Sequence, residues 1–414
     1  MIDRQLLKEV ILDQQSLTLK EDDVLRHLYI HEDNEVVVLS GVRRCGKSTL
    51  LHEIRSVQTQ SDYYLNFDDE RLVSFTTDDF HVLDELFIEL YGRQETYFFD
   101  EIQNIQGWER FVRRLRDHGF KVFVTGSNAS MLSRELGTHL TGRYIQKELF
   151  PFSFKEYLNF KGLEHPDPGI LSTEEKAIIK GHFNQYFEKG GFPAFLKSGN
   201  KEYLKSLYES ILYRDVMVRN RLTNEKELLE LVNFIASNCG KLISYNSLAK
   251  TVGVKNATTI KNYLSFIQDS YLVFLVNQYD NSLKKQIFNA KKAYFIDLGL
   301  IRQLAFHHTE DNGRLLENLV YLELKRRGKE VFYHRRKREC DFVIREKNKI
   351  VEAIQVSWSI EDESTFNREQ AGLLDALDSY NLREGLILTE SMDRNIMAGD
   401  VRITIKPVWR WLLE

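Results

Sequence analysis

The sequence predicts an α/β fold divided into several domains, and three features lead to this prediction. The chain has 414 residues, which is too long for a single ordinary core. In its first third, short apolar runs alternate with helical patterns, as strands and helices do in an α/β domain. Hydrophobic residues make up 43% of the chain, with only 22 Gly and 5 Pro, so disordered and collagen-like classes are excluded. We therefore expect more than one domain, each with a sizeable core.

The first predicted domain covers residues 1–155 and contains a parallel sheet. Residues 1–34 are charged and have a helical pattern. Residues 36–39 (Val-Val-Val-Leu) form a continuous apolar run, which is typical of strands that are buried on both faces. Further strands are expected at residues 63–67, 97–99 and 121–124, with helical stretches between them.

The predicted structure then changes twice. Residues 156–238 are expected to form a helical lid or linker, with helices at residues 174–189, 201–220 and 225–237. Residues 239–300 predict a winged helix, because two short helices around Gly253 precede strand-like runs at residues 271–278 and 292–296. Residues 301–414 predict a second, smaller α/β domain. Its expected elements are a helix at 313–327, strands at 331–334, 340–345 and 350–356, a further helix, and a last strand at 385–388.

Charge, cysteine content and hydropathy narrow the class of protein. The formal net charge is −4, so a nucleic acid would have to be met by local basic patches. The three cysteines are few, odd in number and widely separated, which argues against a disulfide framework and fits a reducing compartment. No apolar run reaches the roughly 18 residues that a membrane span requires. We expect a cytoplasmic protein with no membrane partner.

A phosphate-binding loop (Walker A motif) follows the first predicted strand. Residues 41–48 match the pattern G-x-x-x-x-G-K-[ST], in which glycines let backbone N–H groups approach phosphates. Lys47 would reach the β and γ phosphates, and the hydroxyl of Ser48 would bind Mg²⁺. The helix that opens at Thr49 would direct its positive dipole end at the anion. The predicted residues of this ATP and Mg²⁺ site are Gly41, Arg44, Cys45, Gly46, Lys47, Ser48 and Thr49.

Two acidic residues end a later apolar strand, as in a Walker B motif. After residues 97–99, Asp100 is expected to hold the magnesium shell and Glu101 to polarise the attacking water. The following strand ends in Gly-Ser-Asn, and we expect Ser127 or Asn128 to lie between the loop and the acids and to sense the γ-phosphate. Lys47, Glu101 and Asn128 are therefore candidate catalytic residues.

These motifs resemble the AAA+ archaeal-type ATPase family. The resemblance is carried by residues 36–48, 64–69, 99–103 and 125–128. Residues 190–195, 213–216, 294–299 and 317–324 are similar to the region that follows the ATPase in that family, so the likeness extends over nearly the whole chain. It implies a P-loop AAA+ ATPase fold, while the role of the C-terminal region in the family is poorly defined.

The resemblance also selects one arginine. Residues 140–144 (Leu-Thr-Gly-Arg-Tyr) are similar to the family, which implies that Arg143 contacts the γ-phosphate, as a cation that stabilises phosphoryl transfer. The alternative is an arginine that is solvent-exposed or paired in a salt bridge. Arg143 would act within its own subunit or, in a homo-oligomer, on a neighbouring one.

The predicted winged helix presents polar residues at the start of its second helix. Apolar residues between Leu248 and Ile267 have the spacing of a helix-turn-helix that packs inward. The side chains left outside are Lys255, Asn256, Thr258, Thr259, Lys261 and Asn262. They would contact DNA, or the module would serve as a protein contact.

The last predicted domain resembles the PD-(D/E)xK nuclease fold. That fold holds a metal ion with an Asp and a Glu on adjacent strands, and a Lys two residues after the Glu orients water. The candidate residues here are Glu317, Asp341, Glu352 and Gln355.

The nuclease pattern is degraded in both registers that we consider. With Gln355 at the lysine position, Ala353 stands where the acid belongs, and with Glu352 as the acid, Ile354 stands where the lysine belongs. Because side chains alternate along a strand, Glu352 and Gln355 would not face one site. The domain is then either an inactive nuclease-like fold kept for binding or an active metal nuclease.

Two basic clusters flank this candidate site. They attract phosphate backbones and comprise Lys325, Arg326, Arg327 and Lys329, and then Arg335, Arg336, Lys337 and Arg338. The sequence thus predicts a Mg²⁺-dependent ATPase that acts on nucleic acid, and DNA is the nucleic acid that we expect. One alternative is a nucleotide-gated switch that binds a protein partner and turns over slowly, and another is an ATP-regulated metal nuclease.

Overall fold

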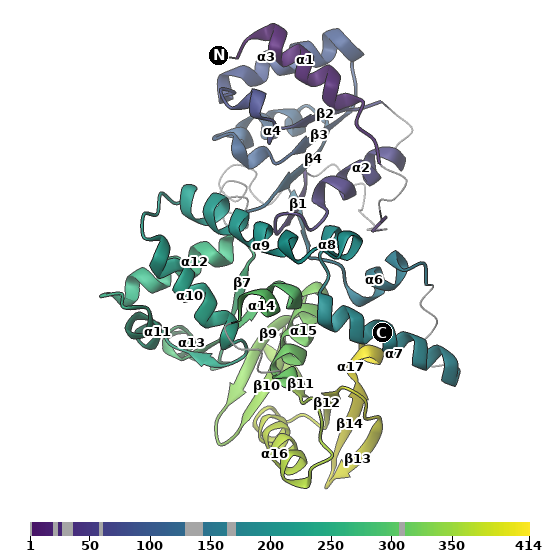
Figure 1. The fold of residues 1–414 in the computed structure, drawn as a ribbon, viewed down its shortest axis with the longest axis vertical. Helices are drawn as coiled ribbons and strands as arrows, with labels where there is room; N and C mark the ends of the chain where they lie inside the picture. Colours follow the sequence, from purple (N-terminus) through teal and green to yellow (C-terminus); the bar gives the residue numbers. More distant parts are fainter. Residues whose placement is uncertain are drawn as a thin grey trace. The chain divides into compact units, whose positions relative to one another are not determined.

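The computed structural model describes residues 2–19, 24–26, 36–57, 61–128, 144–163, 171–305 and 311–414. The chain divides into two compact units. The first comprises Met1–Phe150 and Asp269–Tyr271, and the second comprises Pro151–Gln268 and Leu272–Glu414. Each unit has its own sheet structure and hydrophobic core (Figure 1).

The first unit is built on a five-stranded parallel sheet with the strand order β2-β3-β4-β1-β5. Its strands are β1 (Val36–Gly41), β2 (Tyr63–Asn66), β3 (Thr96–Asp100), β4 (Lys121–Gly126) and β5 (Tyr144–Leu149). The parallel sheet that the sequence predicts is confirmed, and β1 is buried along its whole length. β5 is additional. It is an edge strand that is mostly half-buried, so it carries no continuous apolar run that would reveal it.

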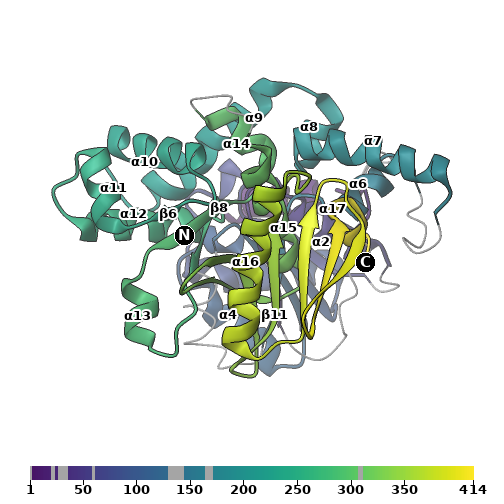
Figure 2. The same ribbon diagram turned by 90° about the horizontal axis from the view of Figure 1, so that it is seen from below.

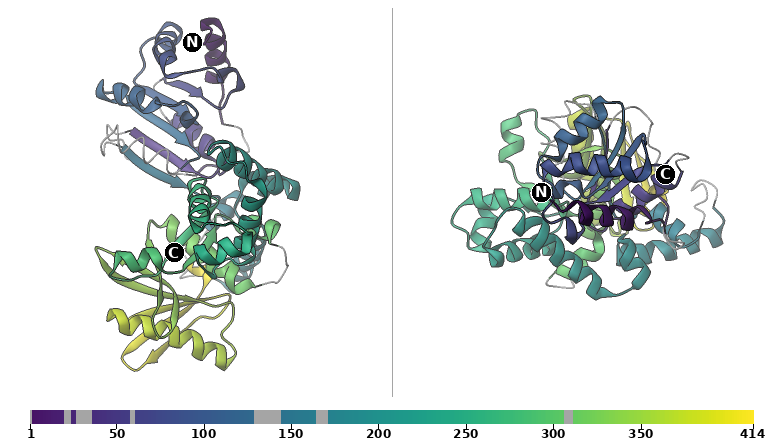
Figure 3. Two further views of the ribbon diagram at one scale, coloured as in Figure 1. Left: turned by 90° about the vertical axis from the view of Figure 1, so that its left-hand side faces the viewer. Right: turned by 90° about the horizontal axis from the view of Figure 1, so that it is seen from above.

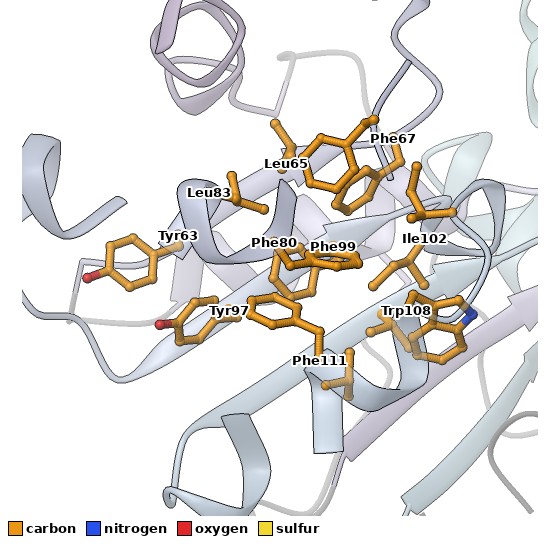
Figure 4. Close-up of a cluster of buried hydrophobic side chains, with 14 of the residues drawn as sticks. Tyr63, Leu65, Phe67, Phe80, Leu83, Tyr97, Phe99, Ile102, Trp108 and Phe111 are labelled. Carbon is orange, nitrogen blue, oxygen red and sulfur yellow. The ribbon is translucent and has the colours of Figure 1, made fainter. Parts of the chain in front are cut away.

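Helices cover both faces of this sheet. They are α1 (Arg4–Gln15), α2 (Lys47–Val57), α3 (Phe80–Tyr91) and α4 (Trp108–Asp117), with the short 3-10 helices η1 (Glu70–Leu72), η2 (Thr77–Asp79) and η3 (Ile102–Asn104). On one face, α1, α3 and α4 enclose an aromatic core that includes Phe80, Phe99 and Trp108 (Figure 4). On the other face lies α2, where Arg55 stacks 4.5 Å from the ring centre of Tyr64.

The second unit begins with a series of helices. They are α6 (Phe154–Phe160), α7 (Thr173–Lys189), α8 (Pro193–Ser198), α9 (Lys201–Ser210) and α10 (Glu225–Ser237). The sequence predicts one helix over residues 201–220, whereas α9 continues as a π-helical segment, η4 (Ile211–Val218). Within η4, Asp215 is buried 3.8 Å from Arg219. Hydrophobic spacing over so short a stretch does not distinguish π-helical turns from α-helical ones.

Two glycines pack against an aspartate that precedes α14 (Leu298–Leu304). The carboxylate of Asp297 accepts hydrogen bonds from Gly191 N at 2.6 Å and from Leu300 N at 3.2 Å. A Cβ on Gly190 would lie 2.3 Å from Asp297 Oδ1, so the close approach requires glycine. Burial raises the pKa of Asp297 to about 6, although the N–H donors oppose the shift. The residue stretches 190–195 and 294–299, noted for their family resemblance, therefore meet in space.

A pair of helices and a small sheet follow α10. The elements are β6 (Leu242–Ile243), α11 (Tyr245–Val252), α12 (Ala257–Asp269), β7 (Val273–Asn277), α13 (Leu283–Phe288) and β8 (Lys291–Phe295). The strands form an antiparallel sheet in the order β6-β8-β7. Gly253 ends α11 with φ +76°, which allows the tight turn into α12. The inward-facing positions from Leu248 to Ile267 are buried as expected, except Val254, which is half-buried.

The remaining chain forms a six-stranded mixed sheet in the order β13-β14-β12-β11-β10-β9. Its strands are β9 (Glu330–Arg335), β10 (Glu339–Glu346), β11 (Lys349–Val356), β12 (Glu384–Thr389), β13 (Arg394–Ala398) and β14 (Val401–Pro407), and its helices are α15 (Asn312–Arg326), α16 (Glu363–Tyr380) and α17 (Val408–Trp411). α16 lies along one face (Figures 2 and 3). It shares a core there with Val343. Tyr321 of α15 contacts Phe342, which points to the other face.

The expectation that residues 385–388 form the last strand is wrong. β13 and β14 follow β12, with β14 parallel to β12 and antiparallel to β13. β14 is fully buried only at alternate positions such as Ile403 and Ile405, and β13 is largely exposed, so neither gives a continuous apolar run. Within the described part of the chain, no helix is long and apolar enough to cross a membrane.

Candidate functional site

The glycine-rich loop connects the end of β1 to the start of α2. Gly41 has φ +155°, and a Cβ there would lie 2.1 Å from the carbonyl oxygen of Leu149 on β5. Gly46, directly before α2, has φ +102°. Both positions favour glycine, because a side chain would force the backbone apart or strain it. The loop thus places uncovered backbone at the N-terminus of α2, where N–H groups and the helix dipole attract anions.

Other residues of the predicted loop differ in exposure. Arg44 adopts a left-handed conformation with φ +63° and is exposed. Cys45 is buried, and burial raises the pKa of its thiol. Ser48 is exposed at the start of α2, and Thr49 beside it is half-buried. The loop therefore combines a buried inner side with an exposed outer side.

Lys47 is a buried cation with a buried counter-ion. Its ammonium lies 3.3 Å from the carbonyl oxygens of Gly41 and Val42 and 3.3 Å from Glu101 Oε1. Burial opposes the charge, but attraction to Glu101 and neighbouring acids raises the pKa of Lys47. The lysine is consequently charged, and its ammonium is held against the backbone of the loop.

Asp100 lies at the end of β3 and is fully buried. The hydroxyl of Thr125 on β4 donates to Asp100 Oδ1 and accepts the N–H of Glu101. Asp100 Oδ2 is buried and has no hydrogen-bond partner among the described residues. Burial and the charge of Glu101 raise the pKa of Asp100, while the hydroxyls of Ser48 and Thr125 oppose the shift.

The free carboxylate oxygen fits a magnesium ion held jointly with a nucleotide. Mg²⁺ usually binds one or two carboxylates and completes its shell with phosphate oxygens and water. Asp100 Oδ2 and the Ser48 hydroxyl supply protein oxygens of this kind. Around Asp100, the described residues contain no group of three or more His, Cys, Asp or Glu side chains that would form a self-contained metal site. The arrangement suits a metal that arrives with its phosphates.

Glu101 is held by two partners at once. Gln103 Nε2 donates to Glu101 Oε2 at 2.5 Å, and Lys47 pairs with Oε1. Burial would raise the pKa of Glu101, but attraction to Lys47, assisted by Gln103 and Arg43, lowers it to about 2. Glu101 is therefore ionised at neutral pH. Its backbone is left-handed, with φ +50°, so the chain turns sharply after the strand.

The end of β4 lies between the loop and the acidic pair, because β4 separates β1 from β3 in the sheet. Ser127 and Asn128 follow this strand and are both buried. The hydroxyl of Ser127 accepts a hydrogen bond from Gln103 Nε2 at 3.4 Å. Arg143, the other predicted catalytic residue, lies outside the described residues.

Two contributors to this site carry no motif in the sequence. Gln103 links Glu101 to Ser127. Arg26 donates to the carbonyl oxygens of Cys45 and Phe150 at 2.8–2.9 Å, and so ties the loop to the end of β5. Gln103 sits two residues from the acids and is visible only as part of the family resemblance. Arg26 comes from the charged stretch before the first predicted strand, where no motif marks it.

The second unit contains another cluster of charged residues. Three of the four residues of the predicted nuclease-like site, Glu317, Asp341 and Gln355, line a cleft of about 550 Å³. A β-bulge between Cys340 and Val343 marks the position of Asp341. Gln355 Oε1 accepts a hydrogen bond from Asp341 N at 3.2 Å. The sequence gives no sign of Lys292, which arrives from β8 and lies 2.8 Å from Asp341 Oδ1.

Glu352 does not belong to this cleft. Its carboxylate pairs with the ammonium of Lys329 at 3.0 Å, and its side chain is 45% exposed. Because side chains alternate along β11, Glu352 and Gln355 face opposite sides of the sheet. The two therefore cannot act together, and Glu352 is removed from the candidate site.

The two basic clusters differ in what they contact. In the first, Arg326 donates to the carbonyl oxygen of Pro151 and pairs with Glu323, and Arg327 stacks on Trp411 at 4.2 Å. These two arginines therefore stabilise the fold of the second unit. The second cluster, residues 335–338, lies at the turn between β9 and β10 and is exposed.

Comparison with known protein families and structures gives the following matches. Residues 33–158 match the AAA domain family AAA_14, and residues 180–311 match a domain of unknown function, DUF8612. A solved structure of the Aeropyrum pernix ORC2 protein in its ADP form is 12% identical, with a TM-score of 0.29, covering 66% of this chain and 85% of that one. The Saccharomyces cerevisiae Hsp104-ADP complex is 13% identical, with the same TM-score, covering 65% of this chain and 39% of that one.

Among curated sequences, this chain is similar to proteins that are described as uncharacterized. The protein MJ1544 of Methanocaldococcus jannaschii is 36% identical over 100% of this chain and 96% of its own length. A protein of Haemophilus influenzae is 28% identical over 96% of this chain and 99% of its own length. With 36% identity over its whole length, this chain belongs to the same protein family as MJ1544, and its residues 33–158, which carry the glycine-rich loop and the parallel sheet, match an AAA domain.

Proposed function

We propose that this protein binds ATP with Mg²⁺ and hydrolyses it, and that hydrolysis is coupled to nucleic-acid binding by the second unit. The observation that carries the ATPase proposal is the contact between Lys47 and Glu101 beside the free oxygen of Asp100. Phosphate binding, metal binding and water activation need these three residue types side by side.

Lys47 is assigned to the β and γ phosphates. Its ammonium contacts two neutral carbonyl oxygens and one carboxylate in the protein alone. The oxygens of a triphosphate are charged acceptors and compete for it strongly. Transfer of Lys47 to the phosphates would release Glu101 from its ion pair. Nucleotide binding would then prepare the residue that acts next.

Glu101 is assigned to the attacking water. Its carboxylate is ionised, which lets it accept a hydrogen bond from water and orient it toward the γ-phosphate. Gln103 would keep the carboxylate in place after Lys47 has left. Asn128, at the end of the neighbouring strand, is assigned to sensing the γ-phosphate, and Arg143 to stabilising its charge from the same or a neighbouring subunit.

Asp100 and Ser48 are assigned to the metal. Bound Mg²⁺ supplies neutralisation of the charge on the β and γ oxygens. Thr125 orients Asp100 by engaging Oδ1, so that Oδ2 remains available. Ser48 is exposed, its hydroxyl interacts with the Asp100 carboxylate, and it offers a neutral second ligand.

The ATPase proposal is tested by separating nucleotide binding from turnover. Lys47→Ala should lose ATP binding, whereas Glu101→Gln should bind ATP and fail to release phosphate. The control is Lys8→Ala, which removes a lysine of the same unit that pairs with Glu89 on the surface of α1 and α3. Binding is measured with a fluorescent ATP analogue and turnover by phosphate release. Unchanged turnover in both site variants would reject the assignment.

Two surfaces of the second unit support the nucleic-acid part of the proposal. We interpret α10, α11, α12 and the strands β6–β8 as a winged helix, which would offer α12 to DNA. At the start of α12, Lys255, Asn256 and Lys261 are exposed as expected. The second surface is the basic turn of residues 335–338, whose side chains are exposed. DNA is therefore the partner that we propose.

The nucleotide-gated switch remains a second candidate, favoured by the contact that binds Glu101. Lys47 and Gln103 together hold the glutamate, so ATP would have to break the pair with Lys47 before Glu101 could act. A switch would bind ATP tightly, turn over slowly and respond to a protein partner. Turnover that rises on adding DNA would exclude this alternative.

A further inference from the structure

The cleft of the second unit already contains a cation. The ammonium of Lys292 lies 2.9 Å from Glu317 Oε1, 3.0 Å from Glu339 Oε1 and 2.8 Å from Asp341 Oδ1. The side chain of Lys292 is only 2% exposed. A single lysine from the small sheet therefore bridges three carboxylates that come from α15 and β10.

Two of these carboxylates also accept hydrogen bonds from neighbouring groups. The hydroxyl of Tyr294 donates to Glu317 Oε1 at 2.6 Å. Asp341 Oδ2 accepts the N–H of Val356 at 3.0 Å. Burial opposes the charge of Lys292, but the three carboxylates raise its pKa well above the usual value. The ammonium is thus permanently charged in the folded protein.

On the opposite side of the cleft, the polar side chains also pair with one another. Gln355 Nε2 donates to Glu369 Oε2 at 2.5 Å, and Glu369 Oε1 pairs with Arg368 at 2.7 Å. Gln355 faces Asp341, so a neutral amide occupies the strand position at which the nuclease-like fold requires an acid. Ser357, two residues later, stands at the lysine position, and its hydroxyl donates to the carbonyl oxygen of Ser359.

The position of Lys292 distinguishes two roles for it. A lysine that orients water would stand beside a metal ion, with the carboxylates turned to the metal. Metal ions bind carboxylate oxygens at about 2.0–2.6 Å, within the space enclosed by those oxygens. Here the ammonium itself fills that space, in contact with all three carboxylates. A divalent ion would have to displace a charged lysine from its three partners.

We propose that Lys292 is the resident cation of this cluster, and that it replaces the divalent metal ion of a nuclease-like site. The cleft is then a charge-paired structural element of the second unit and does not cleave nucleic acid through a metal ion. This inference does not depend on the proposed ATPase activity.

The test is Mn²⁺ binding to the full-length protein without nucleotide, measured by isothermal titration and by electron paramagnetic resonance. Every protein carries Asp100→Asn, so that the nucleotide site contributes no metal. The protein with Lys292 should bind Mn²⁺ no better than the same protein with Asp341→Asn. Lys292→Met should gain one Mn²⁺ site that binds at least about tenfold more tightly than the protein with Lys292 does. Adding Asp341→Asn to Lys292→Met should remove this site again.

Two further measurements keep the proposal falsifiable if Lys292→Met is unstable. Lys292→Arg retains a cation and should bind no Mn²⁺, and Lys292→Met should regain melting temperature when Mn²⁺ is added. A Mn²⁺ site in the protein with Lys292 that disappears with Asp341→Asn or Glu317→Gln would overturn the proposal. So would a folded Lys292→Met protein without any new site.

Discussion

Replacing Glu101 with glutamine should weaken the nucleotide-free protein and increase its response to ATP. The pKa of Glu101 is lowered from 4.5 to about 2, mainly by Lys47, against the effect of burial. A shift of that size corresponds to about 3 kcal/mol of stabilisation of the ionised form. Glutamine keeps the shape of the side chain but leaves Lys47 without its counter-ion.

ATP should restore most of this loss, because its phosphates would provide Lys47 with new negative partners. In the wild-type protein, ATP must first break the pair between Lys47 and Glu101. In Glu101→Gln this cost is absent, so ATP should bind more tightly, by a factor on the order of ten or more. The melting temperature without ATP should fall by several degrees, since about 1 kcal/mol shifts a domain of this size by roughly 2–4 °C.

The assay is thermal unfolding with and without Mg²⁺-ATP, followed by fluorescence of the first unit, with Lys8→Ala as the control. The ion pair between Lys47 and Glu101 also makes the stability of the first unit depend on pH. Because the pKa of Glu101 is lowered by folding, its contribution is present above about pH 4.5 and is lost as the pH falls toward 2. Equal melting temperatures for wild type and Glu101→Gln, with equal shifts on adding ATP, would refute this account of the site.

Three further predictions concern the second unit. Gly372→Ala should destabilise it by about 1–3 kcal/mol in chemical unfolding, since the new Cβ would lie 2.2 Å from the carbonyl oxygen of Glu339. Asp297, whose pKa is raised to about 6, should make the unit lose about 2 kcal/mol as the pH rises from 4 to 6, and Asp297→Asn should flatten that slope. Alanine substitutions of residues 335–337 should weaken DNA binding and reduce its salt dependence.

Each of these predictions has its control. Gly181→Ala lies in α7 with open space around the new Cβ, so it should be neutral or slightly stabilising. Equal stability of the two glycine variants would contradict the packing argument. For Asp297, an unfolding free energy with the same pH slope in wild type and Asp297→Asn would show that another group titrates. For DNA binding, the exposed Arg383 and Arg402 provide a basic pair elsewhere, and an equal loss on replacing them would remove the special role of the turn.

The first unit could be predicted from the sequence wherever its chemistry is local. β1, the glycine-rich loop and the start of α2 are consecutive, and the apolar run and motif identify them together. Asp100 and Glu101 directly follow an apolar strand. The meeting of these two segments follows from the parallel sheet, because the carboxyl ends of its strands share one edge.

The contributors that the sequence did not reveal come from elsewhere in the chain or depend on strand register. Lys292 lies 49 residues from Asp341 along the chain, and no spacing rule connects a lysine of one sheet to an aspartate of another. Gln355, not Glu352, faces Asp341, and only the strand pairing decides between them. β5 and β13 are edge strands with polar residues, so the apolar pattern that identifies buried strands is missing in both.

The measurement that tests the central claim most directly is steady-state ATP hydrolysis by the full-length protein with Mg²⁺. It is made with and without single-stranded, duplex and branched DNA, and Lys47→Ala serves as the blank. We predict hydrolysis above the blank that increases when one of these DNAs is added. Retained ATP binding with hydrolysis at the level of the blank, unchanged by any DNA, would contradict the claim.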